Sequence, residues 1–400
     1  MTDEQSLPLA GIRVLEFTHM VMGPAVGLIL ADMGADVIKI EPAHGDKTRL
    51  LPGSGAGYFP AYNRNKRSMC VDLKSEEGKA AVLRLVDTAD VLIENFRPDT
   101  MDRLGFGYEA LRKRNERLIY CSEKGFLGGP YENRTAMDEV AQMMGGLAYM
   151  TGPPGRPLRA GASVIDVQGG MFGALGVLGA LLQRNLTGEG QKVIASLFES
   201  TVFLVGQHMA QYAVTGEAAA PMPARVSAWA IYQVFDTKDA DQVFVGIVSD
   251  KQWFLLCDAF GLDELAADQS LKTNDARVTE KDRLLPIIQQ VFASYPKAEL
   301  MQKLEASGLP FAPITRPEEL FDDPHLNAGG GLLPFTVTDG ERKGNETKLP
   351  ALPLEMNGRR FGLRRPVPRA GEHTREILAE AGYSGEEIEA MLSRGVVTAE

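Results

Sequence analysis

Short apolar runs alternate with longer amphipathic stretches along the first half of the chain. The runs are rich in β-branched residues, and the stretches between them place apolar residues at helical spacing. The runs lie at 12–17, 36–41, 68–73, 91–93 and 118–122. Strands separated by helices predict an α/β fold with a parallel, Rossmann-like sheet covered by helices. We assign residues 1–215 to this large α/β domain.

A glycine-rich helix is predicted at Met171–Gln183. Gly173, Gly176 and Gly179 recur every three residues along it. Each glycine costs a helix roughly 1 kcal/mol relative to alanine. We therefore expect another backbone to approach this bare face closely. A further strand, 193–198, leads into the next helix.

The pattern changes after this helix and predicts a second domain. A short linker with prolines, 215–225, precedes a possible β-hairpin at 230–235 and 242–247 and three helical patterns. We assign 216–325 to a small α+β domain. Residues 326–400 are predicted to form an extended return segment and C-terminal helices that join the large domain.

Composition and charge narrow the class of protein. Of the 400 residues, 44% are hydrophobic and 24% charged, which is ordinary for a soluble globular protein. The net charge of -11 argues against nucleic acid or an anionic membrane as the main partner. The longest apolar stretch, Gly169–Leu182, is too short and too glycine-rich to span a bilayer. We therefore expect a cytoplasmic protein.

The three cysteines, Cys70, Cys121 and Cys257, are far apart in the sequence. An odd, sparse set is typical of reduced thiols. No group of Cys and His residues has the spacing of a zinc site, so we expect no metal.

Asp166, in the segment SVIDVQGG, is the main candidate for chemistry. Taken alone, an aspartate just before a helix is first of all an N-cap. Two features favour a catalytic role. Gly169 and Gly170 would leave backbone N–H groups open to a ligand, as an oxyanion site requires. The bare glycine face would also let a bulky ligand come close.

Polar residues follow several of the predicted strands. Ligands of open α/β sheets bind beyond the carboxyl ends of the strands. Asn95 offers a hydrogen-bond donor and acceptor, and Phe96 offers a stacking face, although a capped turn with a buried Phe is an equal alternative. Lys124 could reach a ligand at such an edge. His19 could do the same, but a structural histidine is favoured there.

The basic segment Arg64–Arg67 suits phosphate groups, although a solvated turn is the usual explanation for such a run. The arginines at 359–369 are expected to be solvated or to contact a second subunit. No GxGxxG follows the first strand, which disfavours a nicotinamide cofactor. P-loop and GxSxG motifs are also absent from the sequence.

Together these segments resemble the class III CoA-transferases. The matching motifs are LAGIRVLEF, MGP, LADMGADVIKIE, GD-x-TR, NRNKRS, ENFRPDTMDRLGFGYEAL, IYCSEKGF, GP-Y, TGEGQKV and GEHT. Their order and spacing extend the resemblance from about Leu9 to Gly395. The segments YQVFDTKD and KTNDAR are most similar to members that use dicarboxylates.

The resemblance implies a site and an assembly. The family's nucleophilic aspartate falls on Asp166, and coenzyme A would be a substrate rather than a permanently bound cofactor. The positions that contact CoA fall on His19, Met20, Val21, Asn95, Phe96, Arg103 and Lys124. The family fold is a two-domain subunit, and two subunits interlock like links of a chain into a homodimer.

Two departures from the family pattern stand out. Formyl-CoA transferase has an arginine where Pro42 follows Glu41, so Arg49 or Arg64 is expected to recognise the phosphates or adenine. The glycine-run loop that shields its intermediates has no counterpart near 226–240.

The resemblance implies transfer of CoA from an acyl-CoA to a carboxylic acid through aspartyl anhydride and aspartyl-CoA intermediates. By resemblance, the donor is expected to be succinyl-CoA and the acceptor a dicarboxylic acid. A 2-methylacyl-CoA racemase is the second hypothesis. Racemases of this fold carry His-Asp where this chain has Met137-Asp138, and methionine cannot abstract a proton. Asp138 is then expected to contribute to the polarity of the site around Asp166. A CoA-binding protein without catalysis is the third.

Overall fold

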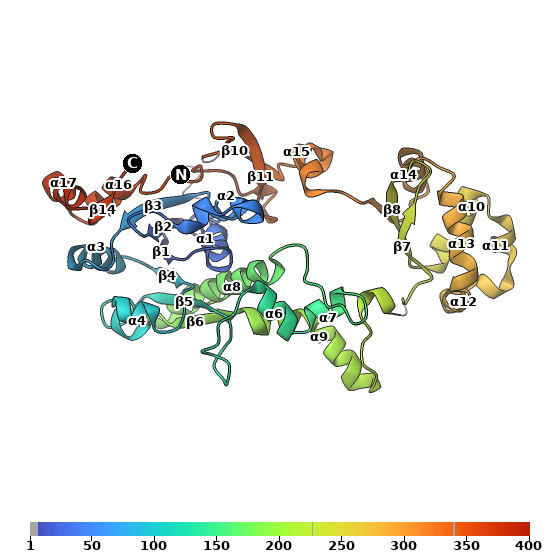
Figure 1. Cartoon of the computed structure of the whole chain (residues 1–400), viewed down its shortest axis with the longest axis horizontal. Helices are drawn as coiled ribbons and strands as arrows, with labels where there is room; N and C mark the ends of the chain where they lie inside the picture. The colour runs from blue at the N-terminus through green and yellow to red at the C-terminus, as the bar shows by residue number, and fades with distance from the viewer. Residues whose placement is uncertain (1–6, 226, 339–340) are drawn as a thin grey trace. The chain divides into compact units, whose positions relative to one another are not determined.

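The computed structural model describes residues 7–225, 227–338 and 341–400. These residues form two compact units (Figure 1). The large unit comprises residues 7–223 and 324–400, and the small unit comprises 224–323. The predicted small domain, 216–325, contains the whole of the small unit.

A seven-stranded sheet forms the centre of the large unit, in the order β14-β3-β2-β1-β4-β5-β6. Neighbouring strands are parallel except β14, which runs antiparallel to β3. The strands are β1 (Arg13–Phe17), β2 (Asp36–Glu41), β3 (Lys66–Val71), β4 (Val91–Glu94), β5 (Ile119–Lys124), β6 (Lys192–Ser196) and β14 (Val397–Thr398). The predicted α/β class with a largely parallel sheet is confirmed.

Helices cover both faces of this sheet (Figure 1). One face packs against α1 (Met22–Asp32) and α8 (Val164–Thr187). The other packs against α3 (Glu76–Val86), α4 (Thr100–Leu104), α5 (Tyr108–Leu111), α16 (Thr374–Glu380) and α17 (Gly385–Ser393). Side chains alternate along each strand, so Val14 joins the first core and Leu15 the second. Both faces are buried, which explains why the strands read as nearly continuous apolar runs.

Helix α8 is longer than predicted and packs closely against α1. A methyl group on Gly170 would overlap the backbone of Met22, and one on Gly173 would overlap the Glu123 carboxylate. A backbone does approach α8 at Gly170, but the nearest neighbours of Gly173 and Gly176 are the side chains of Glu123 and Val193, so the backbone approach predicted at those glycines is wrong. Gly179 faces open space, so close packing does not explain every glycine of this helix.

The length of α8 corrects one argument made from the sequence. With 24 residues it is long and apolar enough, by length and composition alone, to cross a membrane. A core helix of a soluble protein passes the same test. Here Ala174, Val177 and Leu181 are buried against the sheet, so packing inside the unit accounts for much of its apolar character.

Further helices of the large unit pack on α1 or α8, directly or through one another. They are α2 (Tyr58–Tyr62), α6 (Asp138–Met144), α7 (Leu147–Thr151), α9 (Leu197–Thr215) and the short 3-10 helix Lys47–Leu50. Helix α9 ends at Gly216, which adopts a left-handed conformation.

The small unit has a three-stranded antiparallel sheet with helices packed on it (Figure 1). The predicted hairpin forms between β7 (Ile231–Asp236) and β8 (Gln242–Ile247), and β9 (Phe311–Pro313) adds to β8. Its helices are α10 (Asp250–Phe260), α11 (Asp263–Ala267), α12 (Asn274–Thr279), α13 (Lys281–Phe292) and α14 (Lys297–Ala306). Trp253 and Phe292 are at its centre.

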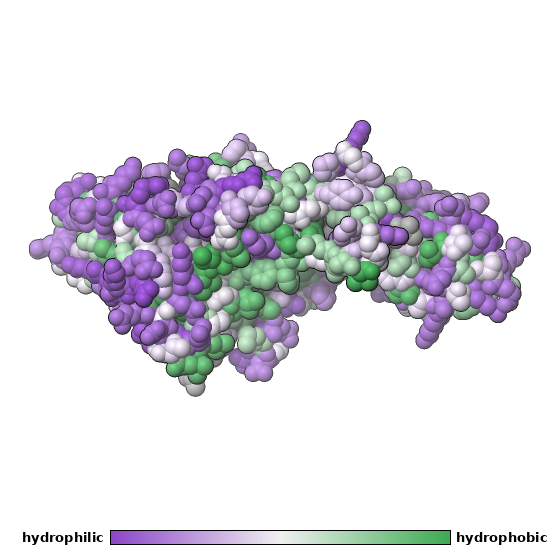
Figure 2. All heavy atoms as spheres, turned by 90° about the horizontal axis from the view of Figure 1, so that it is seen from below, coloured by the Kyte–Doolittle hydropathy of each residue, from purple (hydrophilic) through white to green (hydrophobic). Residues whose placement is uncertain are grey.

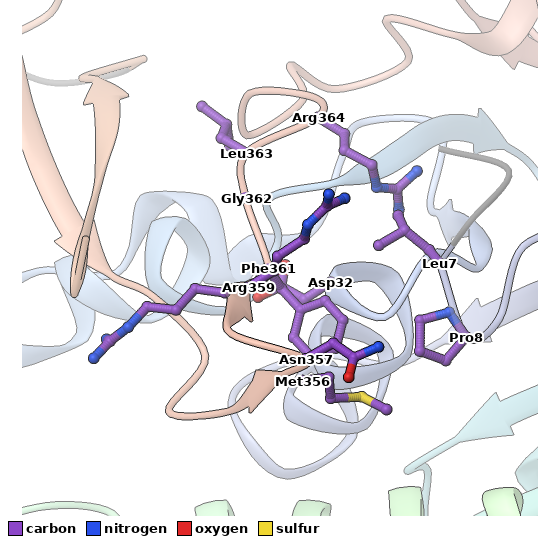
Figure 3. A pocket seen from close by; sticks show the side chains of 11 residues that line it. Leu7, Pro8, Asp32, Met356, Asn357, Arg359, Phe361, Gly362, Leu363 and Arg364 are labelled. Atoms are coloured by element: carbon purple, nitrogen blue, oxygen red, sulfur yellow. The ribbon is translucent and has the colours of Figure 1, made fainter. Parts of the chain in front are cut away.

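The return segment contains two short antiparallel strand pairs as well as residues in extended conformation. Helix α15 (Pro324–Ala328) precedes the hairpin β10 (Leu332–Thr336) and β11 (Glu346–Pro350), and β12 (Glu355–Met356) pairs with β13 (Arg359–Arg360). A cavity of about 770 Å³ lies between this segment and α1 (Figure 3). It is lined by Leu7, Pro8, Asp32, Met356, Asn357 and 359–364, none of which is a candidate site residue.

Candidate active site

The turns that follow β1 and β4 are joined by one side chain. Asn95 accepts a hydrogen bond from the His19 N–H (3.1 Å) and donates one to the His19 carbonyl (2.8 Å). The rings of His19 and Phe96 stack with their centroids 5.5 Å apart. These turns lie at the carboxyl ends of adjacent parallel strands, where ligands of open α/β sheets bind. Three of the residues predicted to contact CoA are thus brought together.

Lys124 extends the same edge of the sheet from β5. Its Nζ lies 2.7 Å from Glu94 Oε1 and donates a hydrogen bond of 2.7 Å to the Phe96 carbonyl. Lys124 therefore holds the Asn95–Phe96 turn in place. Beside it lies a cavity of about 450 Å³, whose lining includes Glu94, Arg97 and Lys124.

The remaining residues predicted to contact CoA differ in how they could do so. Met20 is 40% exposed and has a left-handed backbone, with φ 63°. Val21 is buried, so it can present only its backbone. Arg103 is exposed on α4 and bonds Thr100 Oγ1 at 3.2 Å. The described contacts do not join Arg103 to His19 or Asn95.

Asp166 lies in the first turn of α8, not before the helix as predicted. The N-cap is Ser163. The Asp166 side chain is half-buried, and no described residue donates a hydrogen bond to its carboxylate. Burial, followed by the negative charges of Asp138 and Glu139, raises the pKa of Asp166 to about 7. The group is therefore free of the helix amides and more basic than an ordinary aspartate.

Asp138 performs the capping role that the sequence offered for Asp166. Its Oδ2 accepts hydrogen bonds from the backbone N–H groups of Ile165 (2.8 Å) and Asp166 (3.1 Å). These are among the free amides at the start of α8. Asp138 is only 4% exposed. It therefore holds the first turn of α8 and contributes a negative charge beside Asp166, as expected for the polarity of the site.

The expectation for Gly169 and Gly170 is wrong. Both lie beyond the first turn of α8, where backbone N–H groups bond to carbonyls one turn earlier in the helix. Both are buried, and methyl groups on them would overlap Met22 and Ala25. Their amides cannot form an oxyanion hole, and their bare face receives α1 rather than a ligand.

The expectation that Arg49 or Arg64 binds phosphate is also contradicted. Arg49 bonds both oxygens of Glu41, at 2.7 and 2.9 Å, and the Pro368 carbonyl. Arg64 is buried and paired with Asp32 at 2.6 Å. The alternative of a solvated basic turn is equally wrong for 64–67, because all four residues are buried. The sequence did not reveal their acidic partners, which come from distant positions.

The packing of α8 on α1 brings the two parts of the site to one end of the large unit. Gly169, three residues after Asp166, contacts Met22, the residue that follows Val21. The first turn of α8 and the turn after β1 are therefore neighbours. The predicted nucleophile and the His19–Val21 turn lie on the same side of the sheet core.

Several neighbours of Asp166 were not predicted. Gln142 donates a hydrogen bond to Asp138, and Arg159 pairs with Glu139 and lies 3.8 Å from Asp138. The spacing of four between Asp138 and Gln142 on one helix was the available signal. Tyr62 is close enough for the charge of Asp166 to help raise the pKa of its phenol. Within the described residues, no group of three or more potential ligands could hold a metal ion.

Comparisons with known proteins agree with this fold. Residues 9–374 match CoA-transferase family III. The chain is 36% identical to succinate–glutarate CoA-transferase of Agrobacterium fabrum, over 95% of this chain and 98% of that one. It is 34% identical to formyl-CoA:oxalate CoA-transferase of Streptomyces avermitilis, over 97% and 99%. A crystal structure of a CAIB/BAIF family protein from Brucella suis has a TM-score of 0.83 and 32% identity, covering 94% of this chain and 99% of that one.

The chain therefore belongs to CoA-transferase family III, and it is a class III CoA-transferase. The predicted family is confirmed, and a binding protein without catalysis is not supported. For the racemase hypothesis, Met137 is 60% exposed and has no basic group, while Asp138 is used to bond the amides of α8.

Proposed function

We propose that this enzyme moves CoA from an acyl-CoA donor to a dicarboxylic acid, with Asp166 as the covalent nucleophile. One observation carries the proposal: the half-buried Asp166 carboxylate accepts no hydrogen bond from the described residues. The names of relatives that act on succinate, glutarate and oxalate support small dicarboxylates as substrates and succinyl-CoA as a donor.

The reaction proceeds in four steps. The Asp166 carboxylate attacks the thioester carbonyl carbon, and CoA thiolate leaves, giving a mixed anhydride. The thiolate attacks the Asp166 carbonyl carbon and expels the donor acid, giving aspartyl-CoA. The acceptor carboxylate then attacks this thioester and releases the thiolate again. The thiolate finally attacks the acceptor carbonyl carbon, which forms the product thioester and restores Asp166.

The charge around Asp166 favours the first step. A carboxylate with a raised pKa is a stronger nucleophile than an ordinary one. When Asp166 becomes acylated it loses its negative charge, so its repulsion with Asp138 and Glu139 is relieved. This relief lowers the barrier to acylation relative to a site without those acids. The donors that stabilise the oxyanions must lie outside Gly169 and Gly170.

CoA is proposed to bind at the carboxyl edge of β1, β4 and β5. His19 and Phe96 offer stacked rings, and Met20 offers an exposed side chain. Lys124, which is paired with Glu94, holds the Asn95–Phe96 turn beside the 450 Å³ cavity. Arg103 would need to reach the ligand from α4. Three free, buried cysteines in the described structure support the proposed cytoplasmic location.

The test is a trapping experiment with Asp166→Ala and wild type. Incubation with succinyl-CoA followed by hydroxylamine or borohydride should modify Asp166 in the wild type, as read by peptide mass spectrometry. Exchange onto glutarate or oxalate should be lost in the variant, while CoA binding by calorimetry stays within about twofold. Full exchange by Asp166→Ala would refute the role of Asp166, and deuterium wash-in at Cα without exchange would indicate a racemase.

A further inference from the structure

The turn after β1 is held in a conformation that its own residues do not favour. Met20 has φ 63°, in the left-handed region where glycine is the usual residue. Such a conformation is unfavourable for a residue with a side chain, because its Cβ crowds the backbone. The side chain of Met20 is largely exposed, so it contributes little packing to offset this cost. Hydrogen bonds from buried groups to the backbone of the turn must therefore hold it in this conformation.

Thr48 makes that contact. Its Oγ1 accepts a hydrogen bond from the Met20 N–H (3.1 Å) and donates one to Asp46 Oδ1 (2.8 Å). The Thr48 N–H bonds the same Asp46 oxygen at 2.9 Å. Both Thr48 and Asp46 are buried. The Thr48 hydroxyl group therefore donates its hydrogen to Asp46, and its oxygen is left to accept the hydrogen bond from the Met20 N–H.

Buried charges anchor this relay to the sheet. Lys39 Nζ lies 3.2 Å from Asp46 Oδ2 and donates a hydrogen bond of 2.7 Å to the Thr18 carbonyl. Glu16 on β1 pairs with Lys39 at 3.4 Å and with Lys66 at 2.7 Å. The side chains of Glu16, Lys39 and Lys66 have no exposed surface.

The same network also reaches the start of α1. Lys66 Nζ donates a hydrogen bond of 2.9 Å to the Pro24 carbonyl. Both ends of the 18–24 segment are therefore bonded to one buried ion cluster, through Thr18 at the first end and Pro24 at the second. Thr48 is the connection of this cluster to the middle of the turn.

We infer that Thr48 is a positioning residue for CoA, acting through the Met20 backbone. It holds the His19–Val21 turn in the shape that receives the thioester substrate, and it does not touch the substrate itself. This inference rests on the proposed function, because it assumes that this turn binds CoA. Thr48 belongs to the GD-x-TR segment, residues 45–49. This segment would then contribute to CoA affinity through Thr48, instead of through the direct phosphate contact that was expected of Arg49.

The experiment compares Thr48→Val with Thr48→Ser in the full-length enzyme. Valine keeps the shape of threonine but neither accepts from Met20 nor donates to Asp46, whereas serine keeps both bonds. The Kd for CoA by calorimetry and the KM for succinyl-CoA should rise about five- to tenfold in Thr48→Val, the size expected for one lost buried hydrogen bond. The KM for the acceptor acid should stay within twofold, and Thr48→Ser should restore the wild-type values.

Thr374→Val is the matched control. Thr374 is also a buried threonine whose Oγ1 accepts from a backbone N–H, that of Cys70 (3.2 Å), and donates to a carbonyl, that of Thr398 (2.7 Å). It joins β3 to the C-terminal strand, away from the turn. Its variant should lose thermal stability with no change in KM for succinyl-CoA.

Two outcomes would overturn the inference. Unchanged CoA affinity in Thr48→Val, with trapping at Asp166 intact, would remove the role of Thr48 and leave the proposed function standing. An equal rise in KM in Thr48→Val and Thr374→Val would show that both act only through general stability. Absence of trapping at Asp166 in the wild type would instead count against the proposed function.

Discussion

At the scale of single residues, the two aspartates at the start of α8 divide two tasks. Asp138 accepts the free amides of the helix, so its charge is satisfied by hydrogen bonds. The carboxylate of Asp166 accepts no such hydrogen bonds from the described residues and lies close to the negative charge of Asp138. An aspartate near a helix start is usually a cap, and here the cap comes from a residue 28 positions earlier. This division frees the carboxylate of Asp166 for chemistry.

The pH dependence of kcat/KM should report this arrangement. Asp166 must be ionised to attack a thioester, and its pKa is raised to about 7. Activity should therefore fall about tenfold for each pH unit below 7 and level off above it. Replacing Asp138 by asparagine removes a neighbouring negative charge, so the midpoint should move to lower pH.

Glu139→Gln is the control for that shift, because Glu139 is a smaller cause of the raised pKa than Asp138. It should move the midpoint in the same direction by less. Rates of exchange from succinyl-CoA to glutarate, measured from pH 5 to 8.5, give all three profiles. A wild-type profile that is flat between pH 6 and 8 would contradict the raised pKa.

At the scale of elements, the glycines of α8 occur for different structural reasons. Gly173 is buried, and a methyl group there would overlap Glu123 Oε1 on β5. Burial raises the pKa of Glu123 to about 8, so this carboxyl group is held largely neutral at pH 7 in the gap left by the glycine. Gly179, two turns later, is exposed and meets nothing.

Alanine at these two positions should therefore act in opposite directions. Gly173→Ala should lower the free energy of unfolding by about 1–3 kcal/mol, because the methyl group must displace Glu123. Within a single chain, Gly179→Ala should raise it by up to about 1 kcal/mol through helix propensity. Denaturant unfolding of both variants in parallel measures the difference. Equal effects would mean that the gap at Gly173 is not used by Glu123.

The elements were more predictable from the sequence than their contacts. The periodicity of apolar residues is a local property, so the runs at 36–41 and 91–93 fell on β2 and β4. The basic run at 64–67 was misread because its acidic partners lie 31 or more positions away; they include Asp32, Asp36, Glu16 and Glu380. The start of α8 was placed too late because Asp138, a distant residue, supplies its cap.

At the scale of the whole molecule, the large unit leaves an apolar surface on α8 and α9. Met171, Leu175, Leu182 and Leu186 are each at least 57% exposed and follow one another at helical spacing, and Phe203 on α9 is 72% exposed. Figure 2, which shows the molecule from below, has hydrophobic residues gathered around the middle of that face. An exposed apolar patch of this kind indicates a partner surface. The homodimer implied by the family resemblance is the occupant that we propose.

The mass in solution tests that proposal, because a dimer should have twice the 43.5 kDa of one chain. Phe203→Glu places a charge in the patch without touching the core of the sheet, so it should lower the dimer fraction at micromolar concentration in light scattering. Phe203→Leu keeps the surface apolar and should remain dimeric. The family resemblance also implies that each site lies between the large domain of one subunit and the small domain of its partner, so exchange activity should fall together with the dimer fraction. A monomeric wild type with full activity would contradict both the assembly and its part in catalysis, and would leave the apolar stripe of α8 to another partner.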